Sequence, residues 1–461
     1  MLYNDRLRRQ VIFFFVAFLV YNLNLRPIPA GDSTPAALLP FAILGDHSIA
    51  FDRFEHWYES QHVNAAWFRQ GVDGHWYSAY PILLPLLLTP LYVPLGIFLD
   101  LPHMPVERVV LLARVLEKLS ASLIAALSVA AFLALAEKLT NQRTAVVLTV
   151  VYAFGSQTWS TSSQALWQHG SSELAIVLGL LCFLWALEQP DRYWPAVLTG
   201  VCAGCSVAFR PTNAVFLLVL AGYVLLSGWS PVRKGVFALG ALPLPTAYLI
   251  CNLWMYGHLF SFGEAEGGFA RGALHRGLPG LLISPSRGLL VFSPVFLFAA
   301  IGVYLWFRDG RTWYPKIYGT CLLVTAIHLV VISRWRGWSG GYNYGPRLLT
   351  DIVPLLVIMI IPALRLLQHS RSWRLAFASA LLASISVQAI GVFFYPHGRW
   401  DALPQPLSKQ RERVWDWKDN QILRSVRAGP VLEPYQLAYS FLKNPGESAE
   451  ERLRDKRVKL W

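Results

Sequence analysis

The sequence predicts an all-α polytopic membrane protein, and two observations carry this prediction. Of the 461 residues, 55% are hydrophobic and only 15% are charged. The hydrophobic residues form blocks of roughly 17 to 28 residues, the length that crosses a bilayer as a helix. Because the bilayer interior offers no water to an exposed amide, each block must satisfy its backbone hydrogen bonds within one helix. We therefore expect a single helical bundle in the membrane.

The first expected helix follows the amino end of the chain. Arg6, Arg8 and Arg9 precede the apolar stretch "VIFFFVAFLV", an order that secretory signals share. The segment from Ile28 to Ala30 is a poor cleavage site, however, so we expect this helix to be retained. Further apolar runs bring the expected total to about eleven membrane spans. They lie near residues 110–136, 144–159, 171–187, 193–209, 211–227, 235–256, 289–307, 316–333, 350–367 and 374–395.

One proline-rich run, "YPILLPLLLTPLYVPLGIFLD", has two interpretations. Its prolines, Pro81, Pro85, Pro90 and Pro94, would remove a hydrogen bond from nearly every turn of a spanning helix. If the run stays on the outer side as an interfacial or re-entrant segment, every inner loop is basic, as the positive-inside tendency requires. We therefore expect the amino end inside and the carboxyl end outside. The sequence alone leaves open whether residues 80–99 span the membrane or re-enter it.

Three outer segments are then unusually long or rich in glycine. The first, residues 26–109, is far longer than a connection between neighbouring helices requires. Within it, "AWFRQGVDGHWYSAY" places two aromatic runs around a glycine-bounded turn and predicts a hairpin. The second is residues 257–288, and the third is "SRWRGWSGGYNYGPRLL" at residues 333–349. We divide the chain into a membrane bundle over residues 1–395 and an outer tail over residues 396–461.

Arginines gather in the outer segments, against the positive-inside tendency. Guanidinium groups bind phosphate through paired, rigid donors, which suits a phosphate held at headgroup depth. Taken singly, most of these arginines would also be explained by contact with lipid headgroups. Arg287 in "SPSRG" and Arg347 in "YGPRL" stand beside tight-turn residues where helices begin, near the mouth of the bundle. The outer arginines are Arg26, Arg210, Arg271, Arg276, Arg287, Arg334, Arg336 and Arg347.

Asp32, in "PAGDSTPA", stands where the first helix leaves the membrane. A carboxylate beside a bound phosphate can take a proton from an incoming hydroxyl while the phosphate departs. The alternative is a structural role at the start of a surface helix, with Asp32 or Ser33 as the N-cap and Pro35 in the first turn. Spacing alone favours the cap.

A further polar group lies in "SQALWQHGSSELA" on the outer side. Trp167, Gln168, His169 and Glu173 supply a ring, an amide, an imidazole and a carboxylate within about two helical turns. Such a group suits the binding of a sugar or an acceptor. An aromatic residue at the membrane interface followed by helix-capping groups explains the same pattern equally well.

A charged triplet lies within an expected span. Arg114, Glu117 and Lys118 are three and four residues apart and therefore share one helical face. Charges within a span are functional candidates, and an ion pair that satisfies itself is the plain alternative. The net charge of +13 is not concentrated on a recognisable nucleic-acid-binding motif, so we expect no nucleic-acid partner.

The order of motifs resembles the GT-C superfamily of polytopic glycosyltransferases, in particular the bacterial mannosyltransferases and aminoarabinose transferases. The resemblance covers roughly residues 1–395 and departs from the family at Ile82, where a second proline is usual. It also lacks the paired acidic dipeptide of the protein mannosyltransferases at Gly31-Asp32. The matching stretches are "AGDSTPA", "YSAYPILLPLLLTP", "EKLTNQR", "ALWQHG", "AFRPTN", "SPSRGLLVFSP" and "WSGGYNYGPRLL".

The resemblance implies an inverting transfer of a hexose or pentose from a polyprenyl-phosphate donor. The acceptor, a glycan, lipid or protein, would approach on the extracytoplasmic face of a bacterial inner membrane. Asp32 matches the catalytic acidic residue of the first loop and would act as general base. Arg210, Arg287 and Arg347 would hold the donor phosphate, while the sugar or acceptor pocket would be lined by His169, Glu173, Tyr344, Trp167 and Gln168.

The resemblance implies no organic cofactor. Some members of the superfamily use a divalent metal ion, but the single well-placed acidic residue here does not favour one. The alternative is a flippase for lipid-linked sugars or a protein like the O-antigen polymerases. A transporter should show paired halves with broken helices at mid-membrane, and a polymerase usually has its large loop late in the chain. The sequence does not identify the sugar, the acceptor, the length of the polyprenyl chain or the oligomeric state.

Overall fold

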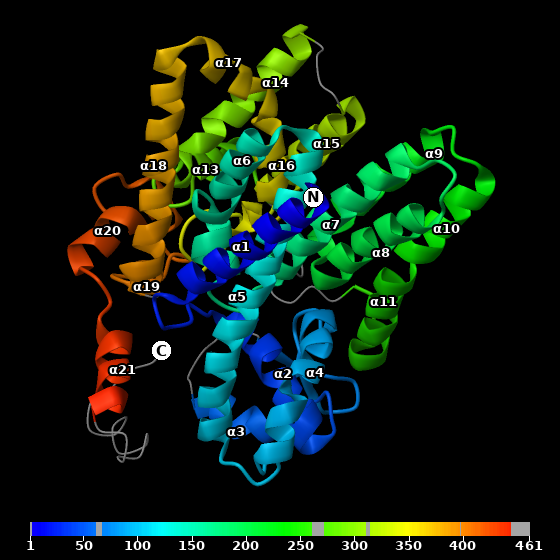
Figure 1. Ribbon diagram of the computed structural model, residues 1–461. Coiled ribbons are helices and arrows are strands. Elements are labelled where there is room, and N and C mark those ends of the chain that lie inside the picture. The colour runs from blue at the N-terminus through cyan, green and yellow to red at the C-terminus, as the bar shows by residue number, and fades with distance from the viewer. Residues whose placement is uncertain (1, 61–66, 261–271, 310–313, 397, 444–461) are drawn as a thin grey trace.

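The computed structural model describes residues 2–60, 67–260, 272–309, 314–396 and 398–443, and it is all-α apart from one small hairpin (Figure 1). The all-α prediction is therefore confirmed. Within these residues, 6 helices are long and apolar enough to cross a membrane, as expected of a membrane protein. This number does not reach the predicted total, because several of the predicted spans form shorter or interrupted helices. The 6 are Val106–Leu139, Gln168–Glu188, Pro231–Tyr256, Pro315–Ser333, Arg347–His369 and Arg371–Phe393.

The first helix, α1 (Leu2–Asn22), lies against α5 (Val106–Leu139). Any stretch of α1 that is long enough to span a membrane includes the charged residues Asp5, Arg6, Arg8 and Arg9. For this reason α1 is not counted among the 6 helices. Its apolar part leaves Phe15 and Leu19 on the surface, spaced as one helical face. The helix α5 has 34 residues, or about 50 Å, and so exceeds the thickness of a bilayer core.

Three α-helices, α6, α7 and α8, follow α5, and the chain is irregular between α6 and α7. The helix α6 ends at Phe154, and a π-helical turn, η3, fills part of the gap before α7. Single π-turns of this kind are frequent at functional sites. The segments are α6 (Gln142–Phe154), η3 (Thr158–Ser162), α7 (Gln168–Glu188) and α8 (Trp194–Phe209).

The next helices, on the right in Figure 1, pack closely on α8. A side chain at Gly200 would place its Cβ 2.2 Å from the carbonyl oxygen of Phe237, and one at Gly240 would lie 2.4 Å from that of Val197. Only glycine permits this approach of two helix backbones, as in many membrane bundles. The elements are η4 (Pro211–Asn213), α9 (Ala214–Leu226), α10 (Pro231–Ala241) and α11 (Pro243–Tyr256).

The second half of the bundle contains two interrupted segments. The runs near 289–307 and 350–367, each predicted as one span, are divided into short helices at Pro294, Pro354 and Pro362, which lack a backbone donor. Such breaks are tolerated inside a membrane protein where other helices surround them. The elements are α12 (Leu274–Ile283), α13 (Leu289–Phe292), η6 (Pro294–Phe296), α14 (Leu297–Asp309), α15 (Pro315–Ser333), η7 (Arg347–Ile352), α16 (Val353–Met359), η8 (Ile361–Ala363), α17 (Leu364–His369) and α18 (Arg371–Phe393).

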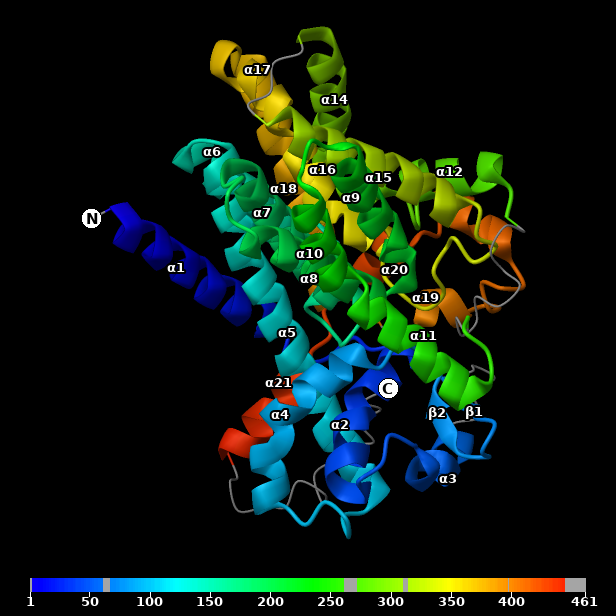
Figure 2. The ribbon, with the colours of Figure 1, turned by 90° about the vertical axis from the view of Figure 1, so that its right-hand side faces the viewer.

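The long first loop folds into a compact layer at the bottom of Figures 1 and 2. The predicted hairpin is confirmed, with Phe68 opposite Ser78 in an antiparallel pair. The proline-rich run forms a 16-residue helix beside α2, where Phe41 and Tyr92 meet edge to face. The elements are η1 (Gly31–Ser33), α2 (Thr34–Asp46), η2 (Asp52–Phe54), α3 (Glu55–Ser60), β1 (Phe68–Gln70), β2 (Trp76–Ser78) and α4 (Leu83–Phe98).

The described part of the tail lies beside the end of α18, on the left in Figure 1. Tyr435 donates a hydrogen bond of 2.8 Å to the carbonyl oxygen of Leu23, so the tail also contacts the exit of the first helix. The elements are α19 (Arg399–Ala402), η9 (Arg411–Trp415), α20 (Gln421–Ala428) and α21 (Glu433–Lys443).

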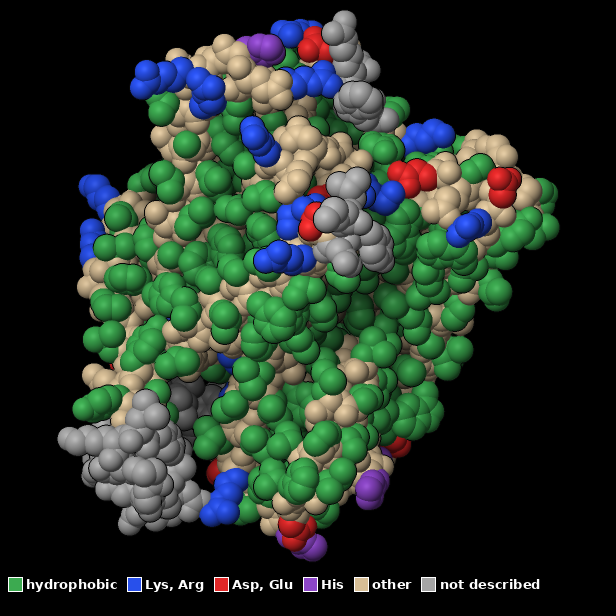
Figure 3. Space-filling model, in the orientation of Figure 1, with side chains coloured by type: hydrophobic (Ala, Val, Ile, Leu, Met, Phe, Trp, Pro, Cys, Tyr) green, Lys and Arg blue, Asp and Glu red, His purple; other side chains and the backbone are tan. Residues whose placement is uncertain are grey.

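The first half of α1 and the carboxyl ends of α5 and α7 meet at one end of the bundle. Arg9 contacts Glu137 at 2.8 Å, and Lys138 contacts Glu188 at 2.6 Å. Figure 3 shows hydrophobic side chains over most of this face of the bundle, with most of the visible lysines and arginines in the upper half. The opposite end carries the layer of α2, α3 and α4.

Candidate functional site

The site is built around an ion pair between Asp32 and Arg347, which joins the long first loop, residues 26–109, to the glycine-rich segment at residues 333–349. Nη1 of Arg347 donates to Oδ2 of Asp32. Nη2 of Arg347 donates to the carbonyl oxygen of Gly340 at 2.7 Å. The guanidinium carbon lies 4.3 Å from the ring centre of Trp167, a cation–π contact. The structure therefore brings three predicted site residues together: Asp32, Trp167 and Arg347.

The local fold explains why the Asp32 carboxylate is free to make this pair. The residue lies in the turn η1, and α2 begins only at Thr34, with Pro35 in its first turn. Asp32 is therefore not the N-cap of α2, and its side chain reaches Arg347 instead. Gly31 must be glycine, because a Cβ there would lie 1.7 Å from Nε1 of Trp67. The indole thus packs directly on the backbone that carries Asp32.

Arg210 belongs to the same site, together with a residue that the sequence analysis missed. Nη1 of Arg210, at the end of α8, donates to Oδ2 of Asp351 and lies 3.1 Å from Nδ1 of His169. The same His169 nitrogen lies 3.4 Å from Oδ1 of Asp351. Asp351 follows Arg347 by four residues in a buried, apolar segment. An acidic residue in such a segment is itself a functional signal, and it could have been found on that ground.

Two acidic and two basic groups therefore share this buried site. Asp32 and Arg347 both lie within electrostatic range of Arg210. Each arginine has one carboxylate partner, Asp32 for Arg347 and Asp351 for Arg210, so the four formal charges cancel. The side chains of Arg347 and Arg210 are 10% and 9% exposed, and that of Asp32 is 23% exposed. An anion that enters this site would meet guanidinium groups that are already desolvated and oriented.

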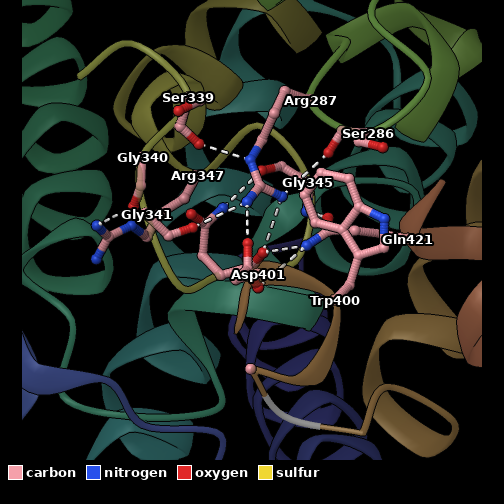
Figure 4. Close-up of polar contacts among 12 residues, drawn as sticks. Ser286, Arg287, Ser339, Gly340, Gly341, Gly345, Arg347, Trp400, Asp401 and Gln421 are labelled. Atoms are coloured by element: carbon pink, nitrogen blue, oxygen red, sulfur yellow. Dashed lines mark hydrogen bonds and ion pairs between the residues drawn. The ribbon is translucent and has the colours of Figure 1, made fainter. Parts of the chain in front are cut away.

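Arg287 has a different environment, among backbone carbonyl oxygens and Asp401 (Figure 4). Nε donates to the carbonyl oxygen of Ser339 at 2.6 Å, and Nη2 donates to that of Gly341 at 2.8 Å and to Asp401 at 2.5 Å. Nη1 donates to the carbonyl oxygens of Ser286 and Asn343. A guanidinium group has five N–H donors, and all five are used. The structure thus leaves Arg287 no donor for a phosphate, contrary to the role first expected of it.

Arg287 and Arg347 instead hold the same loop from two sides. Arg347 bonds the carbonyl oxygen of Gly340, and Arg287 bonds those of its two neighbours. Gly340 and Gly341 have φ angles of 80° and 70°, which favour glycine and let the loop present consecutive carbonyl oxygens to the two arginines. Arg287 therefore positions the loop that positions Arg347.

Asp401 links this loop to the carboxyl-terminal tail. It is buried, pairs with Arg287, and accepts a hydrogen bond of 2.9 Å from the hydroxyl of Tyr395. Burial raises the pKa of the Asp401 carboxyl, and the neighbouring Arg287 opposes this shift. Burial also raises the pKa of the Tyr395 phenol well above its usual value, so this phenol remains a donor.

The remaining predicted pocket residues divide into two groups. Gln168 begins α7 beside Trp167, and His169 follows it within the site. Glu173 lies one turn further into the bundle, is fully buried, and accepts a hydrogen bond of 2.7 Å from Thr158. Tyr344 lies in a hydrophobic cluster with Phe292, and its hydroxyl donates to a backbone carbonyl at 2.9 Å. Neither Glu173 nor Tyr344 contacts Asp32 or an arginine of the site.

The charged triplet of α5 connects the segment that follows Asp32 to the loop that precedes α7. Arg114 donates to Glu117 at 2.8 Å and to the hydroxyl of Thr34, two residues after Asp32, at 2.9 Å. Glu117 in turn accepts from the backbone N–H of Leu166, next to Trp167, at 3.2 Å. Lys118 donates to two oxygens of the same loop, at 2.7 and 3.0 Å. The triplet is thus a bridge between loops as well as an ion pair.

Within the described part of the chain, no three histidine, cysteine, aspartate or glutamate side chains are grouped so that they could hold a metal ion. Comparisons with protein-family models, with curated proteins and with solved structures gave no match.

Proposed function

We propose that this protein is an inverting glycosyltransferase, which moves a sugar from a polyprenyl-phosphate donor to an acceptor at the extracytoplasmic surface of a bacterial inner membrane. The observation that carries the proposal is the carboxylate of Asp32, half-buried and in direct contact with Arg347, with Arg210 close by. A base and two phosphate-binding cations in one site are what transfer from a lipid phosphate requires.

Arg210 and Arg347 are the proposed ligands of the donor phosphate. Nε of Arg347 is buried without a hydrogen-bond partner. For Arg210, neither Nε nor Nη2 donates a hydrogen bond to a described residue. Both guanidinium groups therefore retain donors, whereas Arg287 retains none. Two rigid guanidinium groups with free donors suit the tetrahedral oxygens of a phosphate.

The proposed step forms one bond and breaks one. The acceptor hydroxyl oxygen attacks the anomeric carbon from the face opposite the phosphate, and its proton passes to Asp32. The bond between the anomeric carbon and the phosphate oxygen breaks, and the phosphate leaves with the electron pair, so the configuration inverts. The negative charge that grows on the phosphate is stabilised by Arg210 and Arg347. A phosphate monoester anion leaves readily, so the step needs no separate acid and no metal ion.

Several neighbours have supporting roles in this proposal. Trp167 holds the Arg347 guanidinium against its ring, and Gln168 and His169 face the donor or acceptor from the start of α7. Glu173 and Tyr344 are left out, because they lie away from the charged group. The basic loops at the end of the bundle away from α2 support an inner amino end and an outer site.

The proposal is tested by transfer assays with the purified full-length protein in detergent. Radiolabelled polyprenyl-phosphate mannose, glucose and arabinose serve as donors, and envelope lipids and glycans serve as acceptors. We expect transfer from one donor and a loss of at least about a hundredfold in D32N, the low end for removal of a catalytic base. The matched control is D46N, an aspartate of the same layer that pairs with Arg53 away from the site. Equal transfer by D32N and D46N would remove Asp32 from the base role.

A further inference from the structure

We propose that His169 is a third ligand of the donor phosphate, that a proton controls its strength, and that Asp351 holds the protonated ring in place. This inference rests on the proposed function, because it assigns one more contact to the same anion. The contact of His169 with the phosphate depends on pH, whereas the arginine contacts do not.

The contacts of His169 assign the position of the proton on its ring. Nδ1 lies 3.1 Å from Nη1 of Arg210, and a guanidinium group has donors only. Nδ1 must therefore accept, so the ring is neutral and carries its proton on Nε2. Nε2 has no hydrogen bond to a described residue. Its N–H group is therefore available to a bound anion.

Asp351 provides a second partner for the same ring nitrogen. Its Oδ1 lies 3.4 Å from Nδ1 of His169 and has no hydrogen-bond partner among the described residues, although it is fully buried. Buried carboxylate oxygens without a partner are rare, so Oδ1 of Asp351 is an acceptor that remains available. A proton added to Nδ1 would point at this oxygen. Asp351 thus offers an acceptor that the neutral ring does not use.

One proton from solvent would then change two contacts together. With Nδ1 protonated, His169 donates to Oδ1 of Asp351, and its Nε2–H becomes a charged donor toward the phosphate. Nη1 of Arg210 loses its contact with Nδ1, so one more guanidinium N–H becomes free for the same phosphate. Protonation therefore adds a charge-assisted donor and releases a second donor.

The surrounding charges make this proton uptake depend on the anion. Nη1 of Arg210 touches the imidazole and Arg347 packs on the neighbouring Trp167, so two guanidinium charges repel a positive charge on the ring. Glu173 lies one turn away on the same helix, and its nearest described partner is Thr158. A bound phosphate diester adds a negative charge beside the ring. Phosphate binding and proton uptake should therefore favour each other, as reciprocal linkage requires.

The test is a binding measurement with farnesyl methyl phosphate, a phosphodiester that keeps one negative charge across the pH range. Its affinity for the purified full-length protein is measured at about pH 8 and about pH 5, the lower value lying well below an ordinary histidine pKa because the neighbouring guanidinium groups disfavour a charged ring. We expect the wild type to bind about tenfold more tightly at the lower pH, the size of one charge-assisted hydrogen bond. H169Q should bind the diester with the same affinity at both pH values. H103Q, which changes an exposed histidine of the first loop, should behave like the wild type.

The binding results distinguish a failure of the His169 role from a failure of the donor site. If H169Q keeps the pH dependence of the wild type, the inference is overturned while the donor site stands. If the wild type binds the diester at neither pH, the donor site fails and this inference fails with it. D351N should flatten the pH dependence as H169Q does. Because D351N also breaks a buried ion pair, H169Q decides the question if D351N does not fold.

Discussion

Asp32 and Arg347 form an ion pair although 315 positions separate them in the sequence. Asp32 comes from the turn before α2, and Arg347 begins the interrupted segment η7. The pair closes one wall of the site, and the contacts of Arg347 with Gly340 and Trp167 fix the guanidinium from two other directions. This arrangement leads to separate expectations for residues that bind the phosphate and residues that hold the loops.

Arg287 should matter for stability and not directly for donor binding. R287A would leave Asp401 buried without its cation, which typically costs about 3–5 kcal/mol. We expect a large fall in the temperature of thermal unfolding in detergent. R210K should leave that temperature nearly unchanged and weaken binding of a lipid phosphate, because lysine lacks the paired donors of arginine. The reverse result, with R287A stable and R210K unfolded, would contradict the assignment.

Trp167 should act on the reaction through Arg347. W167L removes the ring that lies 4.3 Å from the guanidinium carbon, a contact worth about 1–2 kcal/mol when desolvated. We therefore expect transfer to fall roughly tenfold, and W167F should recover part of it. The measurement is the initial rate of transfer with the fold checked by thermal unfolding. Equal rates for the leucine and phenylalanine variants would show that the ring face has no role.

Gly31 should be needed because of Trp67. G31A would bring a Cβ to within 1.7 Å of the indole nitrogen, so the turn that carries Asp32 must shift. We expect G31A to reduce transfer strongly. The double variant G31A/W67A removes the obstructing ring and should transfer faster than G31A alone. If the double variant is no faster, the crowding between these two residues does not explain the loss.

The hairpin of the first loop should weaken as pH rises. Nδ1 of His75 lies 2.6 Å from Oδ2 of Asp52, and this hydrogen bond raises the pKa of His75. A raised pKa in the folded state means that the contact stabilises the hairpin below the unfolded pKa of histidine. That stabilisation is lost as pH rises through the folded pKa.

Amide hydrogen exchange in β2, corrected for its intrinsic pH dependence, measures this effect. Protection at Trp76 and Tyr77 should fall with increasing pH in the wild type. In D52N the protection should be lower throughout and should depend less on pH. An identical pH dependence in the two proteins would rule out the contact as its cause.

Much of the fold could be predicted from local patterns. Long apolar runs give the helices, and the aromatic runs around "GVDG" give the hairpin between β1 and β2. The lengths of the helices were harder to predict, because a proline can interrupt a helix while the chain continues inside the bundle. Residues Arg347–His369 form such a segment, interrupted but 94% buried in its most apolar stretch.

The site was only partly predictable, because its partners come from distant segments. Asp32 and Arg347 each had a local signal, an acidic residue after a helix and an arginine beside a glycine turn. Arg287 has the same kind of local signal, but its structural role follows from its ion pair with Asp401 in the tail. No local pattern in the sequence connects these two residues. Asp351 lies inside an apolar run, and only its charge marks it. Spacing can place a side chain on a helix, but it does not show which distant group pairs with it.

The proposed function requires Arg210 and Arg347 to hold the phosphate of a lipid donor together, beside Asp32. A cryo-EM structure of the full-length protein with farnesyl methyl phosphate would locate that phosphate. We expect phosphate density between the two guanidinium groups, with Asp32 no longer fully engaged by Arg347. Phosphate density at another site, with both arginine–carboxylate pairs intact, would contradict it.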